Sequence, residues 1–123
     1  MNIRPVSFGM AAIFTDKGVQ QIIKTSSNVS KDRADNFVSC AEQFKRDLSS
    51  TQHVDVIVDK TGVLFPRLKA KVVRKDTPKR EVLSTFKQPR LNKTSTRFFD
   101  ASTQSARNAE MVISSSEDFN VTT

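Results

Sequence analysis

Apolar and polar residues alternate most regularly in the segment HVDVIVD, residues 53–59. Val54, Val56 and Val58 share one side of an extended chain, and mainly polar residues share the other. This period of two predicts a strand with one buried face. Residues 67–75, RLKAKVVRK, repeat the pattern, with apolar residues on one face and a row of cations on the other. The segment REVLSTFK, residues 80–87, predicts a further strand.

Turns are predicted between these strands. Residues 59–62, DKTG, end in a glycine that can take the positive φ of a short hairpin loop, so residues 63–65 are expected to begin the return strand. Pro66 lacks an amide hydrogen and is expected to break that strand or confine it to an edge. Residues 76–79, DTPK, predict the second turn. Its length leaves the register open, because Val82 and Phe86 join the cationic face with an even loop and the core face with an odd one.

A spacing of three and four between apolar residues predicts a helix at residues 30–49. Ser30 is the expected N-cap, and Asp32 lies in the first turn, where it suits the helix dipole. The helix is expected to pack against the sheet. Its predicted apolar stripe consists of Ala34, Phe37, Val38, Ala41, Phe44 and Leu48.

Two weaker helices are predicted on either side of these elements. Thr15 or Asp16 is expected to cap a short helix with an apolar stripe of Val19, Ile22 and Ile23. Near the other end, Asp100 or Ser102 is expected to cap a weak helix that runs to Ile113. Phe98 and Phe99 precede that helix and are expected to anchor it on the core.

The whole pattern predicts one α+β domain. Residues 1–14 contain Pro5 and Gly9 and are predicted as a first strand, with Gly9 marking a bulge or a close approach of the backbone. The expected architecture is an antiparallel sheet of about four strands packed by two N-terminal helices, with a weak C-terminal helix. At 123 residues the chain fits a single domain, predicted at 1–113, followed by a flexible acidic tail at 114–123.

The positive charge belongs to one part of the chain. The net charge is +7, yet residues 60–97 hold 12 Lys and Arg against Asp76 and Glu81, a balance of +10, so the remainder is acidic. A basic segment of this kind suits RNA, DNA, an anionic membrane surface or an acidic protein as partner. The alternative is that its lysines keep a solvent-exposed sheet face soluble and discourage edge pairing. The candidate binding residues are Arg67, Lys69, Lys71, Lys75, Arg80 and Lys87. Phe86 is the candidate for stacking on a base. Sparse surface aromatics argue against a single-strand reader, because such proteins usually rely on several stacked rings.

Residue counts exclude several classes of site. One Cys and one His cannot supply a structural zinc site, and three glycines cannot form a Walker loop or a dinucleotide fingerprint, so neither metal nor cofactor is expected. Cys40, His53 and Asp55 supply the residue types of a nucleophile, base and orienting acid. The apolar setting of Cys40 instead favours a buried structural thiol, and no catalytic residue is assigned.

The cellular compartment is inferred from the cysteine count and from the length of the apolar runs. A single cysteine is compatible with a reducing environment, and no apolar run approaches the length of a transmembrane segment, so a cytoplasmic protein is expected.

Two resemblances accompany this interpretation. The opening Met-Asn-Ile-x-Pro-Val-x-Phe, residues 1–8, resembles the start of small uncharacterised proteins predicted from gut-bacterial genomes, and it implies no activity. The expected order of one strand, two helices and three antiparallel strands with a basic sheet is similar to that of the RelE and ParE bacterial toxins. That resemblance implies a cationic sheet face that engages RNA or a partner. The leading hypothesis is a non-enzymatic interaction protein, and the alternatives are a nucleic-acid-binding module and a toxin-like ribonuclease.

Overall fold

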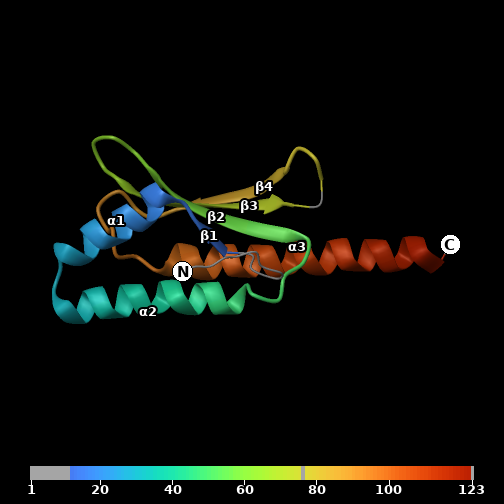
Figure 1. Ribbon diagram of the computed structural model, residues 1–123, viewed down its shortest axis with the longest axis horizontal. Coiled ribbons are helices and arrows are strands. Elements are labelled where there is room, and N and C mark those ends of the chain that lie inside the picture. The colour runs from blue at the N-terminus through green and yellow to red at the C-terminus, as the bar shows by residue number, and fades with distance from the viewer. Residues whose placement is uncertain (1–11, 76, 123) are drawn as a thin grey trace.

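The structure is a computed structural model that describes residues 12–75 and 77–122, with side chains described as far as residue 116. The strands and helices follow the order predicted from the sequence, with α3 at the C-terminal end (Figure 1). The described elements are β1 (Ala12–Phe14), α1 (Asp16–Ser27), α2 (Lys31–Asp47), β2 (Val54–Thr61), β3 (Arg67–Arg74), β4 (Val82–Lys87) and α3 (Arg97–Thr122). Most of the predicted first strand, including Pro5 and Gly9, lies outside the described residues.

The four strands form one sheet in the order β1-β2-β3-β4. The α+β class is therefore confirmed. The prediction of a purely antiparallel sheet is wrong, because β1 pairs with β2 in parallel, Ala12 opposite Val56, while β2-β3 and β3-β4 are antiparallel. The reason is the crossover: α1 and α2 carry the chain back along the sheet before β2 begins, and such a return brings two strands together in parallel.

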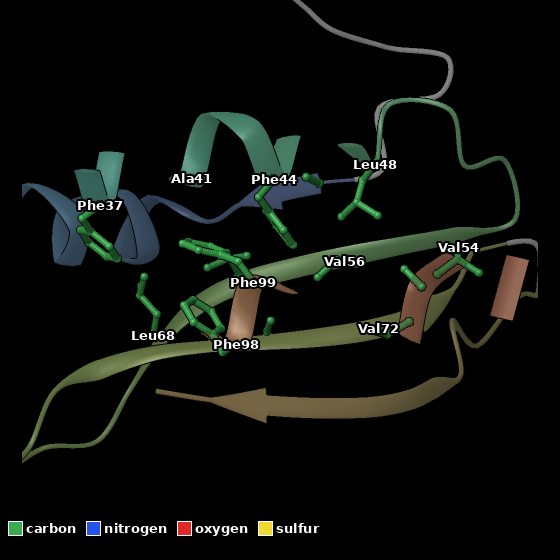
Figure 2. Packing of buried hydrophobic residues seen from close by; sticks show 14 of the residues in the cluster. Phe37, Ala41, Phe44, Leu48, Val54, Val56, Leu68, Val72, Phe98 and Phe99 are labelled. Atoms are coloured by element: carbon green, nitrogen blue, oxygen red, sulfur yellow. The ribbon is translucent and has the colours of Figure 1, made fainter. Parts of the chain in front are cut away.

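The hydrophobic core lies between the sheet and the helices α2 and α3. Figure 2 shows Phe44 of α2 and Leu48, the C-cap just after it, on the side of the helix that faces the sheet. Val54, Val56 and Val58 of β2 are fully buried on that face, as the alternation predicts. The rings of Phe44 and Phe99 lie 4.8 Å apart between centroids, which joins α2 to α3. Leu68, Ala70 and Val72 of β3 complete the buried face.

The N-caps predicted for α1 and α2 are confirmed, with Thr15 and not Asp16 as the cap of α1, whereas α3 begins before Asp100 and Ser102, so neither of them is its cap. The hydroxyl of Thr15 accepts the amide hydrogen of Gly18, and the hydroxyl of Ser30 accepts that of Arg33. Of the apolar stripe predicted for α1, Ile22 packs against the core, but Val19 and Ile23 are exposed, so that part of the prediction is wrong.

Close contact with β2 explains which face of α1 turns inward. A Cβ atom added at Gly18 would lie 2.6 Å from the carbonyl oxygen of Val58. Only glycine permits that approach, and it brings Gln21 and Thr25 inward with Gly18. On α2, Val38 is likewise exposed although the pattern placed it in the stripe.

The hairpin between β2 and β3 differs from its prediction. β2 continues to Thr61, and Gly62 adopts the expected positive φ of 89°. The next three residues do not start the return strand, because β3 begins only at Arg67. Val63 and Leu64 are 93% and 86% exposed at the tip of this loop. Three consecutive apolar residues indicate a strand by composition, but Pro66 and the turn at Gly62 leave them unpaired.

A β-bulge decides the register that the sequence left open. Val72 pairs with Ser84 and Val73 pairs with Val82, so Leu83 is the extra residue. The bulge puts Val82 and Phe86 on opposite faces: Phe86 packs against the core and Val82 is exposed. Neither predicted alternative, with both residues on one face, is correct.

The C-terminal helix is longer than predicted. α3 begins at Arg97 instead of near Asp100, and it continues to Thr122 through the segment predicted as a tail. Phe98 and Phe99 are buried in its first turn and anchor it on the core, as expected. In Figure 1 the last turns of α3 project beyond the sheet. The flexibility of residues 114–123 stays a prediction.

Candidate anion-binding surface

The second face of the sheet, which we call the open face, points away from α2 and α3 (Figure 1). Within residues 12–75 and 77–116, no helix covers this face. Strand alternation and register place a defined set of residues on it. They are Ile13 of β1, Asp55, Ile57, Asp59 and Thr61 of β2, Arg67, Lys69, Lys71 and Val73 of β3, and Val82, Thr85 and Lys87 of β4.

Four of the six predicted binding residues come together on the open face. Arg67, Lys69 and Lys71 occupy alternate positions of β3, and Lys87 of β4 lies directly opposite Lys69. Like charges in directly opposed positions destabilise a sheet. The structure therefore keeps a repulsive cluster of cations on an exposed face, and a bound anion would relieve that repulsion. We call these four residues the basic cluster.

Asp59 partly balances the basic cluster from the other side of β3, where it pairs in register with Lys69. A 2.7 Å hydrogen bond from the Thr15 hydroxyl lowers the pKa of Asp59, with smaller contributions from the Lys60 amide and the charges of Lys69 and Lys17 against the opposing effect of burial. The carboxylate is thus held in its charged form. One carboxylate against four cations leaves a net positive charge.

The other two predicted residues are already paired within the protein. Arg80 Nη2 lies 2.6 Å from Asp55 Oδ2, and Lys75 Nζ lies 3.5 Å from Asp55 Oδ1. Asp55 is only 5% exposed, so its charge requires these partners. Arg80 has a positive φ of 50°, which is uncommon for a residue other than glycine. Lys75 and Arg80 are thus separate from the basic cluster and stabilise the bulged end of the sheet.

Phe86 is not available for stacking on a base. Its side chain packs against the core, and the described residues of the open face include no aromatic ring. Binding at this face would therefore depend on charge and on hydrogen bonds to phosphates.

A cavity of about 420 Å³ at the end of the sheet was missed by the sequence analysis. Among the described residues, four cations line it, Lys24 of α1, Arg33 of α2, and Arg90 and Lys93 of the segment after β4, and no acidic residue does. We call this cavity the basic pocket. The remaining lining residues are Gln21, Thr25, Asn28, Val29, Phe65, Pro66, Leu91, Asn92 and Thr94.

Gln88 holds one wall of the basic pocket in place. Its side chain is 2% exposed, and its Oε1 accepts the amide hydrogen of Leu68 at 2.9 Å. Its Nε2 donates to the carbonyl oxygens of Lys93 at 2.8 Å and Ser95 at 3.0 Å. These bonds tie the segment 89–95 to β3. A glutamine just after a strand gives no sequence signal for this role.

The residues considered for catalysis have other partners. His53 Nδ1 lies 2.6 Å from Glu110 Oε2, and Asp55 bonds Arg80, so Asp55 does not orient the His53 ring. Cys40 is partly buried and packs against the core. The part of the chain described by the structure contains no group of three or more His, Cys, Asp or Glu side chains placed to hold a metal ion.

Comparisons with family models, curated proteins and solved structures found no match to the chain. No helix among the described residues has the length and apolar content needed to cross a bilayer.

Proposed function

We propose that the protein is a non-enzymatic binding protein whose partner is a single-stranded nucleic acid, held by its phosphates on the open face. The observation that carries this proposal is the direct opposition of Lys69 and Lys87, with Arg67 and Lys71 beside them. Successive phosphates can contact several of these cations at once, which relieves their mutual repulsion.

The geometry favours a flexible single strand over a rigid duplex. The major groove of a duplex is about 12 Å wide and admits a two-stranded ribbon, so it is too narrow for a face of four strands about 4.8 Å apart. A single strand can lie along β3 and β4 and adapt to their twist. The absence of a described aromatic ring on this face implies weak preference for particular bases. Affinity is expected to come mainly from charge.

Salt dependence tests the proposal. Each phosphate contact contributes about 0.7 to the slope of log affinity against log salt on a single strand, so replacing Lys69, Lys71 and Lys87 by Gln should reduce that slope by about 2. The matched control replaces Lys31, Lys45 and Lys79 by Gln, which removes the same charge outside the open face. The slope of log affinity against log salt should change in this control by less than about 0.7, the contribution of one phosphate contact.

Three results would contradict the proposal. They are no binding of RNA or DNA at low salt, equal slopes for the parent and the open-face variant, and equally tight binding of polyglutamate, which would assign an acidic protein as partner.

RNA cleavage is the second candidate function, because the order of strands and helices agrees with the order on which the resemblance to the RelE and ParE toxins rests. The same titrations supply the test when RNA length is measured afterwards. Binding with intact RNA is the expected result. Cleavage by the parent that is lost in the open-face variant would replace the binding proposal by a ribonuclease.

A further inference from the structure

The basic pocket combines a ligand-sized volume with concentrated positive charge. About 420 Å³ lies within the usual range of small-molecule sites. Lys24, Arg90 and Lys93 form no ion pair with any described acidic residue, and Arg33 Nη2 donates to the neutral Thr94 hydroxyl at 2.7 Å. Four cations without a carboxylate repel one another in the free protein. A terminal phosphate, with more than one negative charge, would balance them better than a diester would.

The other walls of the basic pocket suit the remainder of a nucleotide. Asn28 Nδ2 already donates to the Lys24 carbonyl oxygen and Asn92 Oδ1 already accepts from Thr94. The other amide atoms, Asn28 Oδ1 and Asn92 Nδ2, can bond a sugar or the edge of a base. Phe65 lines the same cavity and is 43% exposed, whereas the other described phenylalanines are buried or partly buried. An exposed ring beside a phosphate site offers a stacking surface for a base.

The chain connects the basic pocket directly to the basic cluster. Pro66 lines the pocket and Arg67 begins β3, while Lys87 ends β4 and Arg90 lines the pocket. At this junction Arg67 Nε is buried and has no hydrogen-bond acceptor among the described residues. A phosphate chain on the open face therefore meets further cations on its way to the pocket.

The orientation of the two surfaces favours a strand over a membrane. The pocket is lined by α1, by the turn after it and by α2, whereas the open face points away from α2. A flexible strand can bend from one surface to the other, but a flat bilayer meets only one of them at a time. Exposed Val63 and Leu64 at the neighbouring hairpin tip make an anionic lipid the alternative to test.

We propose that the basic pocket receives the phosphorylated end of the single strand whose other phosphates lie on the open face. This inference rests on the proposed function, because it requires a strand on the open face. It adds a preference that the open face alone does not give: a terminal phosphate should strengthen binding.

The test compares one short RNA sequence carrying a 5′-phosphate, a 3′-phosphate or hydroxyls at both ends. Dissociation constants are measured at one salt concentration by fluorescence anisotropy. One of the two phosphorylated RNAs is expected to bind about tenfold tighter than the RNA with hydroxyls at both ends. This is the gain expected when a terminal phosphate accepts hydrogen bonds from the cationic side chains of the pocket. Replacing Arg90 and Lys93 by Gln should remove this preference. The control, Lys45→Gln with Lys79→Gln, removes equal charge elsewhere and should retain it.

The possible failures are distinguishable. If the parent binds all three RNAs equally, the terminal-phosphate site is wrong and the open-face proposal stands. If the parent binds none of them, both proposals fail. A free mononucleotide that binds as tightly as the phosphorylated RNA would overturn the placement of a chain end. Sedimentation with vesicles of anionic phospholipid, lost when Val63 and Leu64 become Ser, would overturn it in favour of a lipid headgroup.

Discussion

Replacing Gln88 by Met tests how the protein builds the wall of the basic pocket. Met nearly retains the side-chain volume at this buried position but makes none of the three hydrogen bonds to the backbone of Leu68, Lys93 and Ser95. The change therefore isolates hydrogen bonding from packing.

The expected loss follows from where the three partners lie. Leu68 is fully buried, so its amide hydrogen has no access to water and costs about 1 to 3 kcal/mol when left unpaired. The carbonyls of Lys93 and Ser95 lie on a surface segment and can turn to water, so each bond accounts for about 0.5 to 1.5 kcal/mol. Because such values do not add fully, we expect the free energy of unfolding to fall by about 2 to 4 kcal/mol.

Denaturant unfolding of the parent and Gln88→Met provides the measurement. The midpoint should fall while the dependence on denaturant concentration stays unchanged. The control is Gln104→Met at an exposed position of α3, which should change stability by less than about 0.5 kcal/mol. If Gln88→Met changed stability no more than this control, other contacts would hold the segment 89–95, and the account of the pocket wall would be wrong.

Three further changes test the core and the helix contacts. Phe44→Ala should lower the free energy of unfolding by about 3 to 5 kcal/mol, and an unchanged melting temperature would contradict its burial. Gly18→Ala should destabilise the protein despite a gain of about 1 kcal/mol in helix propensity, because its Cβ would clash with the Val58 carbonyl; a higher melting temperature would refute that close approach. Burial raises the pKa of Glu110, but hydrogen bonds from His53 and Gln52 outweigh it and leave that pKa below its ordinary value of 4.5. A carboxyl group whose pKa is lower in the folded than in the unfolded protein stabilises the fold at pH values above the unfolded pKa. That stabilisation is lost as the pH falls through the folded pKa, so lowering the pH below about 5 should destabilise the parent more than it destabilises Glu110→Gln. Parallel acid profiles for the two proteins would contradict this contribution.

Local patterns predicted the elements in which one residue type repeats at a fixed spacing. β2 follows from its alternating valines, and α2 follows from Ser30 as cap and Phe37, Ala41 and Phe44 at its buried face. The cationic side of β3 was also predictable, because side chains of a strand alternate whatever its partners are. These features depend on neighbours within a few positions of the chain.

Features that depend on distant contacts were not predictable. The parallel pairing of β1 is decided by the crossover through α1 and α2, and the rotation of α1 by the close approach of Gly18 to Val58. The bulge at Leu83 changes which side chains of β4 face the core without any local signal. Regular alternation along β4 would therefore place Val82 on the same face as Phe86, whereas the structure has them on opposite faces.

The basic pocket was missed for a similar reason. Its cations come from three separate parts of the chain, at residues 24, 33 and 90–93. Each is an ordinary exposed cation in its own segment. These cations surround one cavity only because the end of α1 and the start of α2 pack beside residues 89–95, the segment that Gln88 holds in place.

The most direct test of the central claim is a map of backbone amide chemical shifts during titration with single-stranded RNA at low salt. Binding at the open face predicts the largest changes at Lys69, Lys71, Thr85 and Lys87, with continued changes at residues 90–93 when the RNA carries a terminal phosphate. Amides on the solvent-facing side of α2 beyond its first turn, which holds the pocket residue Arg33, should stay unchanged. Shifts confined to α2 and α3, with β3 and β4 unaffected at saturation, would contradict the claim that the open face binds nucleic acid.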